Sequence, residues 1–280
     1  MLYHYDVLHN LANCYLLHLP ERSVRTVRIL VTSSKGGIGK STLSVGLAVA
    51  FAKMGRRVLL CDCDLGGRCL DMLLGEENNV LFDISDVASG RTDGKSALIN
   101  PWETENLFFC PAPAVYDPED FKDGALMRAL RDLEAACSAD HVICDTAGTV
   151  FAPDIAGGFA ETALVVSTQQ PASVRAAETT AVILSERGLT DSRLIINMFE
   201  WQSAEKGIRS GIIDMIDGAG IRCEGIVPYS RSLMLAGEAG RPVSERIPVM
   251  QAFKNIAARL EGDTVKLFTG IPKAVSRKIL

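Results

Sequence analysis

The residues of this chain with the clearest chemical potential lie in one short run that is rich in glycine and contains two lysines. The run consists of Lys35, Gly36, Gly37, Ile38, Gly39, Lys40, Ser41 and Thr42. A glycine-rich turn between a strand and a helix gathers backbone N–H groups around an anion, and the positive end of the helix dipole adds to the attraction. We therefore expect the run to bind the phosphates of ATP. Lys40 is expected to reach the β- and γ-phosphates, and the Ser41 hydroxyl to bind Mg²⁺.

This run departs from the general phosphate-binding pattern and meets a stricter one. The general pattern, G-x-x-x-x-G-K-[ST], requires glycine at position 34, where this chain has Ser34. The tighter pattern K-G-G-x-G-K-[ST] is met in full, and it adds Lys35. An apolar segment of strand character precedes the run and a helical segment follows it. The run therefore predicts a nucleotide site rather than a turn that binds nothing.

Three aspartates stand where apolar segments end. Asp62 and Asp64 follow one such segment, and Asp145 closes another. Nucleotide sites on open α/β sheets form at the carboxyl ends of strands, and hydrolysis of a phosphoanhydride needs a carboxylate on the metal side and a group that orients the attacking water. We assign the metal side to Asp145 together with Ser41. Asp62 is expected to support the metal site or the serine and threonine hydroxyls of the loop. We assign the orientation of water to Asp64.

The elements that must position these residues alternate along the chain. We expect strands at 27–33, 57–63, 107–111, 141–145, 162–167, 193–197 and 221–227. We expect helices at 41–54, 120–137, 232–240 and 248–260, and one more that follows the strand at 162–167 and ends at about 186. Near-continuous apolar strands are typical of parallel sheets that are covered on both faces. The alternation predicts an α/β fold with a doubly wound, mostly parallel sheet flanked by helices on both faces.

The bulk properties set the domain boundaries and exclude some classes of protein. The chain has 280 residues, of which 48% are apolar, so a disordered chain is excluded. We expect an N-terminal extension at 1–26, one ATPase domain at 27–261 and a C-terminal tail at 262–280. The formal net charge of −5 argues against DNA as a partner. No apolar stretch is long enough to span a bilayer, and the first residues do not form a secretion signal, so we expect a cytoplasmic protein.

The cysteines predict neither a disulfide framework nor a metal site. There are eight of them and no C-x-x-C pair. In a chain of this length without an export signal, they are expected to be free thiols. Cys61 and Cys63 lie two apart in an apolar strand, so we expect them to share one face of it as small core residues.

The second lysine is the point at which the sequence resembles the MinD/ParA family of deviant Walker A ATPases. The segment 62–75, D-C-D-L-G-G-R-C-L-D-M-L-L-G, is similar to the first switch of the MinD branch, whereas the ParA branch usually has D-x-D-P-Q-G-N. The resemblance implies a P-loop NTPase fold and a homodimer in which two ATP molecules lie between the subunits. It implies that Lys35 contacts the nucleotide of the partner subunit, and it supports catalytic roles for Lys40 and Asp64.

Further carry-over from the family concerns the second switch and the base. The second switch commonly has D-[ST]-P-A-G, and the proline is absent from D-T-A-G at 145–148. Gly148 is placed to donate its N–H to a γ-phosphate. By the same resemblance, Asn197 ends a strand where family members contact adenine. Pro228 and Tyr229 lie where the next loop wraps the base.

The C-terminal tail leaves two interpretations open. Residues 265–280 mix apolar and basic side chains and contain no acid, a composition that suits a reversible interfacial anchor on anionic lipid. Gly270 and Pro272 interrupt a helix there, which favours a packed or frayed tail. The first interpretation would add peripheral attachment at the inner face of the plasma membrane.

The leading functional hypothesis is a MinD-like ATPase. It would bind Mg-ATP, dimerise on ATP binding, and hydrolyse ATP as a switch that positions or regulates a partner protein, such as the cell-division or polar machinery. The first alternative is a ParA-type partitioning ATPase that binds DNA. The second is a metal-cluster carrier ATPase, which the lack of a cysteine between Asp145 and Cys223 disfavours. The third is a scaffold that senses ATP but barely hydrolyses it.

Overall fold

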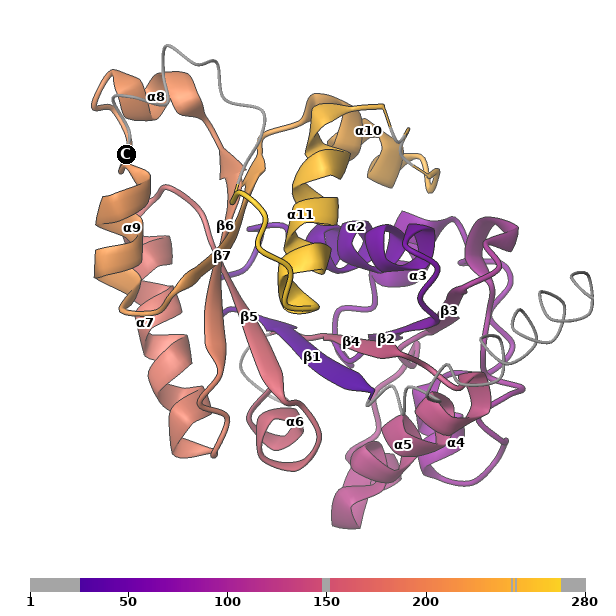
Figure 1. Ribbon diagram of the computed structural model, residues 1–280. Helices are drawn as coiled ribbons and strands as arrows, with labels where there is room; N and C mark the ends of the chain where they lie inside the picture. Colours follow the sequence, from indigo (N-terminus) through magenta and orange to yellow (C-terminus); the bar gives the residue numbers. More distant parts are fainter. Residues whose placement is uncertain (1–25, 148–151, 243, 245, 268–280) are drawn as a thin grey trace, which may run out of the picture.

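The computed structural model describes residues 26–147, 152–242, 244 and 246–267 (Figure 1). Its strands are β1 Val27–Thr32, β2 Val58–Asp62, β3 Leu107–Cys110, β4 His141–Asp145, β5 Thr162–Ser167, β6 Ser192–Phe199 and β7 Cys223–Pro228. Its α-helices are α2 Lys40–Lys53, α3 Leu70–Leu74, α4 Ile84–Ala88, α5 Ala125–Cys137, α6 Ala152–Gly158, α7 Pro171–Glu186, α8 Trp201–Glu205, α9 Ile212–Ala219, α10 Arg231–Glu238 and α11 Pro248–Leu260. Two 3-10 helices, η1 Pro101–Glu103 and η2 Pro118–Gly124, complete the set.

The seven described strands form one sheet in the order β3-β2-β4-β1-β5-β6-β7. Each strand pairs in parallel with its neighbours, so the doubly wound sheet predicted from the sequence is confirmed. β1 lies at the centre and β4 beside it, and Asp62 at the end of β2 stands in register with Asp145 at the end of β4. Because the strands are parallel, their carboxyl ends meet along one edge, and this edge carries the predicted site.

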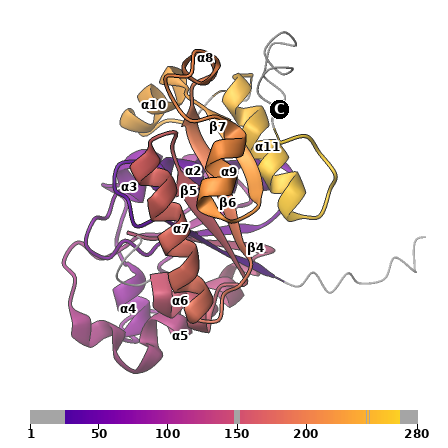
Figure 2. The same ribbon diagram turned by 90° about the vertical axis from the view of Figure 1, so that its left-hand side faces the viewer.

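Helices cover both faces of the sheet. α2, α3, α10 and α11 lie on one face, and α4, α5, α6, α7 and α9 on the other (Figures 1 and 2). Along β1, Ile29 and Val31 enter the core on the first face, while Leu30 enters the core on the second. Burial of such a side chain contributes about 1.5–3 kcal/mol. This double burial explains why the strands are apolar almost without interruption.

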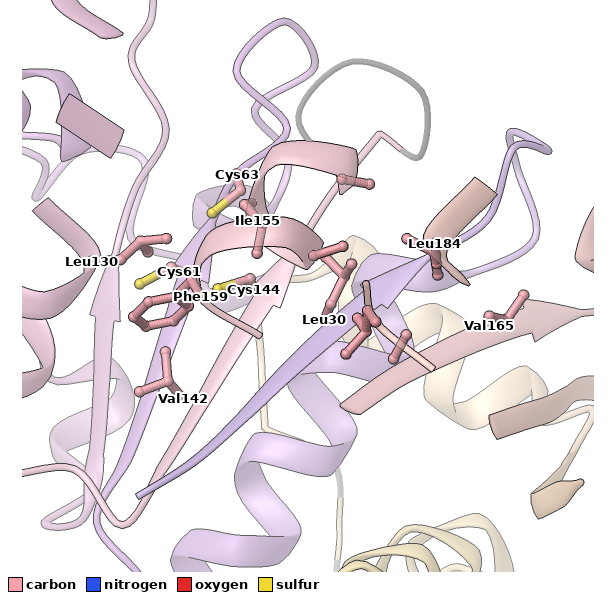
Figure 3. Packing of buried hydrophobic residues seen from close by; sticks show 14 of the residues in the cluster. Leu30, Cys61, Cys63, Leu130, Val142, Cys144, Ile155, Phe159, Val165 and Leu184 are labelled. Carbon is pink, nitrogen blue, oxygen red and sulfur yellow. The ribbon is translucent and has the colours of Figure 1, made fainter. Parts of the chain in front are cut away.

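The core of the second face is unusually rich in thiols (Figure 3). Cys61 and Cys63 both lie in it, which confirms that they share one face. Cys61 stands in register with Cys110 of β3 and Cys144 of β4, so thiols follow one another across three strands. All of them are free, and burial raises the pKa of the Cys61 and Cys110 thiols well above the usual range.

Several expected elements have other bounds in the structure; the strands expected at 193–197 and 221–227 are Ser192–Phe199 and Cys223–Pro228, and two helices also differ. The helix predicted at 120–137 begins only at Ala125, because Lys122 and Asp123 have non-helical dihedrals within the preceding η2, which ends at Gly124. Gly124 then adopts a left-handed conformation, with φ of 73°, before α5 starts. The helix predicted at 232–240 begins at Arg231 and ends at Glu238, and the Ser230 hydroxyl accepts a hydrogen bond from the Leu233 N–H as its N-cap.

The expectations about the two ends of the chain fall largely outside the described residues, which begin at Thr26 and end at Leu267. The part of the expected tail that is described lies against α11. Arg259 donates to the Val265 carbonyl and Asn255 to the Lys266 carbonyl. Within the described residues, no helix is both long enough and apolar enough to cross a membrane.

Candidate nucleotide site

The glycine-rich run forms the loop between β1 and α2. Gly37 and Gly39 have φ of 70° and 81°, a left-handed backbone that favours glycine. Gly39 is also tightly packed, since a Cβ there would stand 2.6 Å from Nδ2 of Asn197. The run ends at the first turn of α2, where unpaired backbone N–H groups and the helix dipole attract an anion.

The serine at position 34 is compatible with this loop. Ser34 is not among the residues with positive φ, so its backbone does not need glycine. Its N–H donates to Thr180 Oγ1 over 3.2 Å, and its hydroxyl donates to the Ala176 carbonyl over 3.3 Å. Both partners belong to α7, so the start of the loop is fastened to that helix.

The structure brings Ser41 and Asp145 together. Ser41 Oγ donates to Asp145 Oδ2 over 2.6 Å, and Ser44 Oγ donates to Asp145 Oδ1 over 2.8 Å. Asp145 is 1% exposed. Burial raises its pKa to about 6, while the two hydroxyl donors act in the opposite direction. A buried carboxylate beside a serine hydroxyl, at the start of the phosphate-loop helix, offers the oxygen ligands that Mg²⁺ prefers.

Asp62 is placed differently from Asp145. Its carboxylate accepts backbone hydrogen bonds from Asp64, Cys69 and Leu70, at 3.1–3.2 Å. Burial and, next, the charge of Asp145 raise the pKa of Asp62 to about 7, against these donors. In this arrangement Asp62 fixes the segment 64–70, so its direct ligation of a metal stays a prediction.

Asp64 lies on a tight turn that projects into the site. The N–H groups of Gly67 and Arg68 donate to its backbone carbonyl over 3.0 and 3.1 Å. The side chain folds back over Gly67, because a Cβ on Gly67 would stand 2.6 Å from Asp64 Oδ2. Arg68 has φ of 25° and forms an ion pair of 2.6 Å with the buried Asp71. The turn thus holds the Asp64 carboxylate at the wall of the cleft described below.

The two lysines of the run donate hydrogen bonds to oxygen atoms of the protein. Lys40 Nζ donates to the Lys35 carbonyl over 3.3 Å, across the loop. Lys35 Nζ donates to Gln170 Oε1 over 2.6 Å, at the start of α7. Neither ammonium is paired with a carboxylate in these hydrogen bonds, so both are available for phosphate oxygens, which are stronger acceptors of charged donors.

A cleft of about 960 Å³ opens over the loop. Its walls are the loop itself, α3 with the 64–69 turn, and α10. Of the residues predicted from the sequence, it is lined by Gly36, Gly37, Gly39, Lys40, Ser41, Thr42 and Asp64. An adjoining cleft of about 360 Å³ is lined by Lys35, Ile38 and Tyr229, among others. The volume of the larger cleft is sufficient for a nucleotide.

The three residues predicted to contact the base do not line one cleft together, unlike most of the residues predicted to bind the phosphates. Asn197 was expected to end a strand, but it lies two residues before the end of β6. Its Nδ2 donates to the Ile38 carbonyl over 2.8 Å, and it lines neither cleft, so in this structure it supports the phosphate loop from behind. Pro228 ends β7, and Tyr229, which is half exposed, follows it. Gly148 lies outside the described residues.

Several residues of the site were not foreseen, and three of them show what the sequence could have revealed. Ser44 lies one helical turn after Ser41, a spacing that places both on one face of α2 and could have revealed it. The Cys69 thiol donates to Ser41 Oγ over 3.2 Å, and no residue pattern indicates this contact. Met198 lines both clefts directly after Asn197, and its position at the carboxyl edge of the sheet was the available signal.

Comparisons with known proteins agree with this geometry. Residues 29–243 match the family described as the CobQ/CobB/MinD/ParA nucleotide binding domain. The chain is 30% identical over 246 residues to the septum site-determining protein MinD of Neisseria meningitidis, covering 84% of this chain and 91% of that protein. Among solved structures, it is similar to the MinC:MinD cell division complex of Aquifex aeolicus, with a TM-score of 0.78, 30% identity and coverage of 87% and 99%. MinD of Pyrococcus horikoshii, complexed with Mg-ADP, shares the fold with a TM-score of 0.72, 22% identity and coverage of 85% and 96%.

Proposed function

The chain belongs to the CobQ/CobB/MinD/ParA nucleotide-binding family, and on that premise we propose that it is a MinD-like ATPase switch. In this proposal, Mg-ATP binding makes two copies dimerise, and hydrolysis of ATP releases them. The observation that carries the proposal is the joint placement of the two loop lysines with the Ser41–Asp145 pair at one edge of the sheet. The cycle would position or regulate a partner protein, such as the cell-division or polar machinery.

Phosphate binding is the first step of the proposal. The loop N–H groups of residues 36–42 take the phosphates, and Lys40 exchanges the Lys35 carbonyl for a phosphate oxygen. A charge-assisted hydrogen bond is roughly twice as strong as a neutral one, so this exchange favours the bound state. It also frees the backbone of Lys35. We propose that Lys35 then leaves Gln170 and contacts the nucleotide of the partner subunit.

The residues at the carboxyl ends of β2 and β4 fit a bound Mg²⁺. Ser41 of α2 and Asp145 would hold it, with Asp62 in support, because hydroxyl and carboxylate oxygens suit a hard cation and burial disfavours the charges of the two carboxylates. Mg²⁺ supplies neutralisation of the charge that develops on the phosphate oxygens. The raised pKa values of Asp62 and Asp145 describe two carboxylates that are destabilised until a cation arrives.

Asp64 is proposed to orient the attacking water, since its carboxylate lies at the wall of the nucleotide cleft beside the phosphate loop. On the side of the base, Tyr229 and Pro228 are proposed to enclose adenine. Asn197 is proposed to act there as well as behind the loop. These assignments rest on the placement of the side chains and on the family resemblance.

The partner is proposed to be a regulatory protein, because a solved relative forms a MinC:MinD complex. We do not propose DNA as a partner, given the net charge of −5. The proposal places the protein in the cytoplasm. Peripheral attachment to the inner face of the plasma membrane would depend on residues 268–280, which lie outside the described part of the chain.

The decisive experiment measures ATP hydrolysis and the molar mass in solution with saturating Mg-ATP. We expect the native chain to become dimeric and to hydrolyse ATP. Asp64→Ala should remain trapped as an ATP-bound dimer, because binding is intact and water is not oriented. Lys35→Ala should dimerise more weakly, because the contact with the partner's nucleotide is lost.

Lys95→Ala is the matched control, because Lys95 is exposed and lines neither cleft. It should behave as the native chain does. A native protein that stays monomeric with saturating Mg-ATP would refute the switch. A protein that binds ATP and dimerises without turnover would support the nucleotide-sensing scaffold instead.

A further inference from the structure

Exposed methionines gather at the nucleotide cleft. Among the residues that the structure describes, three methionines have exposed side chains: Met72 is 55% exposed, Met198 37% and Met234 45%. All three line the 960 Å³ cleft. They come from different elements, since Met72 belongs to α3, Met198 to β6 and Met234 to α10.

The other described methionines lie elsewhere. Met215 and Met250 are buried in the two cores. Met54 and Met127 are half-buried, and neither lines the cleft. Exposure of large apolar side chains to water is unfavourable, so their concentration at one cleft indicates a surface that an occupant covers.

Met198 is the most closely integrated of the three. Its φ is 52°, a left-handed conformation that costs energy for a residue with a side chain. The pairing of β6 with β7 shifts register between Ile196 and Phe199, so the strand turns at this point. The turn directs Met198 over the phosphate loop, where its Cε would stand 3.0 Å from a Cβ on Gly39. Backbone strain of this kind is stored at functional sites.

Thioethers are well suited to the flat face of a nucleobase. Methionine is flexible and polarisable, and a sulfur contact with an aromatic ring contributes about 0.3–1.5 kcal/mol. The same sulfur is the atom most readily oxidised in an exposed apolar side chain. A wall built of exposed thioethers is therefore both apolar and chemically vulnerable.

We propose that Met72, Met198 and Met234 form an oxidation-sensitive wall of the nucleotide cleft, where conversion to methionine sulfoxide by a peroxide switches nucleotide binding off. In this step the thioether sulfur attacks one peroxide oxygen. With hydrogen peroxide, the S–O bond forms as the O–O bond breaks and the sulfur is oxidised by two electrons; the departing hydroxide takes up the proton of the transferred oxygen and leaves as water. This inference rests on the proposed function, because the cleft is the one assigned to ATP.

The consequence follows from size and polarity. A sulfoxide oxygen on Met198 would add bulk beside Gly39, where there is little room, since even a Cβ on the glycine would stand 3.0 Å from Met198 Cε. Met198 also lines the smaller cleft with Tyr229, so its sulfoxide would place a polar group beside the proposed position of the base, and sulfoxides on Met72 and Met234 would make the wall of the larger cleft polar. Nucleotide affinity should fall, while the fold should persist because these side chains are outside the two cores.

The test uses the full chain, treated with hydrogen peroxide and then with catalase and dithiothreitol. Mass spectrometry of peptides locates the sulfoxides, and calorimetric titration with Mg-AMP-PNP gives the affinity. We expect oxidation to weaken binding at least tenfold in the native chain and in Met127→Leu, the control outside the cleft. The triple variant Met72→Leu, Met198→Leu, Met234→Leu should lose less than twofold, because leucine preserves volume and does not oxidise. Methionine sulfoxide reductase should restore the native chain.

A second readout is shielding. Saturating AMP-PNP should slow the oxidation of Met198 several-fold and leave that of Met127 unchanged. The inference is overturned if the native chain keeps its affinity after the cleft methionines are oxidised, or if the native chain and the triple variant lose affinity equally. Cys69→Ser is tested in parallel because its thiol also lines the cleft; protection by this change alone would assign the effect to the thiol and refute the methionine wall. Failure of the unoxidised chain to bind AMP-PNP would refute the proposed function itself, a result distinct from the others.

Discussion

Strand β4 begins at His141 and ends at Asp145, and both residues are buried ionisable groups. At the amino end, His141 stacks on Phe51 with 3.9 Å between ring centroids, and its Nε2 lies 3.1 Å from Glu261 Oε1. Glu261 in turn forms two hydrogen bonds with Arg56, of 2.6 and 3.0 Å. The Glu261 carboxylate at this end therefore has a cationic partner within the chain, whereas Nδ1 of His141 is buried without a hydrogen-bond partner among the described residues.

At the carboxyl end, no such hydrogen bond joins the carboxylate of Asp62 or Asp145 to a cationic side chain in the described residues. Asp145 accepts hydrogen bonds from two neutral serines, and Asp62 accepts them from backbone N–H groups. The nearby Lys40 donates to a carbonyl rather than to either carboxylate. Two buried carboxylates on adjacent strands therefore repel each other and are costly to hold. The amino end of β4 is thus arranged for stability, and we infer that the carboxyl end gives up stability for ligand binding.

The largest expected effect is at the carboxyl end. Asp145→Asn removes one of the two repelling charges and keeps the shape, so it should lower Mg-dependent ATP hydrolysis by at least about 100-fold while stabilising the ligand-free protein by roughly 1–3 kcal/mol at pH 8. Hydrolysis assays and urea unfolding without Mg²⁺ or nucleotide measure the two quantities. A variant that loses both activity and stability would contradict the comparison, because it would show that the charge of Asp145 supports the fold.

The second prediction concerns pH, to which the two ends should respond in opposite directions. The folded-state pKa values of Asp62 and Asp145, about 7 and about 6, lie above those of an unfolded aspartate, so the folded state holds extra protons between about pH 4 and pH 7. The stability contributed by these protons is lost as the pH rises through this window. Burial, which outweighs the hydrogen bond to Glu261, lowers the pKa of His141, so its contribution is lost as the pH falls below about 6.5.

Urea unfolding of the ligand-free chain from pH 5 to pH 8 separates the two ends. Asp145→Asn should flatten the loss of stability on the alkaline side, and His141→Gln should flatten the loss on the acidic side. Each variant serves as the control for the other. Profiles that change on the same side in both variants would show that the ends are not independent.

The third prediction concerns the amino end alone. Glu261→Gln removes the carboxylate that forms hydrogen bonds with Arg56 and should destabilise the protein by about 1–2 kcal/mol, because the hydrogen bonds to charged groups are weakened. Hydrolysis at a temperature where both proteins are folded should be unchanged. Lys122→Gln is the matched control, since its ion pair with Glu119 is more than 60% exposed on both sides and should contribute almost nothing. A large loss of hydrolysis in Glu261→Gln would show that the two ends of β4 are coupled.

Much of this contrast was accessible from the sequence. The parallel sheet followed from apolar strands that alternate with helices, and the carboxylates at strand ends pointed to the edge that carries Asp62, Asp64 and Asp145. The amino end of β4 was not predicted. His141 meets Phe51 and Glu261 only because α2 and α11 end beside it, and such long-range packing leaves no local pattern.

In the phosphate loop, too, the sequence predicts local features but not contacts with distant segments. Its glycines and lysines predict the turn and its ligand, because the requirement on φ and on charge is local. The role of Ser34 depends on its contacts with α7, and that of Asn197 on its contact with the Ile38 carbonyl. The kink at Lys122 and Asp123 was missed because helical apolar spacing continues across it, while Gly124 ends the 3-10 helix.

The smallest expected effect tests how the carboxyl end is held before a cation arrives. Ser44 donates to Asp145 Oδ1, and Ser41 donates to Oδ2. If Ser41 is the only serine that binds the metal, Ser44→Ala should raise the Mg²⁺ concentration for half-maximal hydrolysis only about three- to fivefold. The reason is that one net hydrogen bond of about 1 kcal/mol is lost from an otherwise intact carboxylate. Ser41→Ala, the matched change one turn earlier, should raise this Mg²⁺ concentration far more. Equal losses in the two variants, measured as the Mg²⁺ concentration for half-maximal hydrolysis, would show that both hydroxyls serve the cation and that Asp145 is positioned from α2 as a unit.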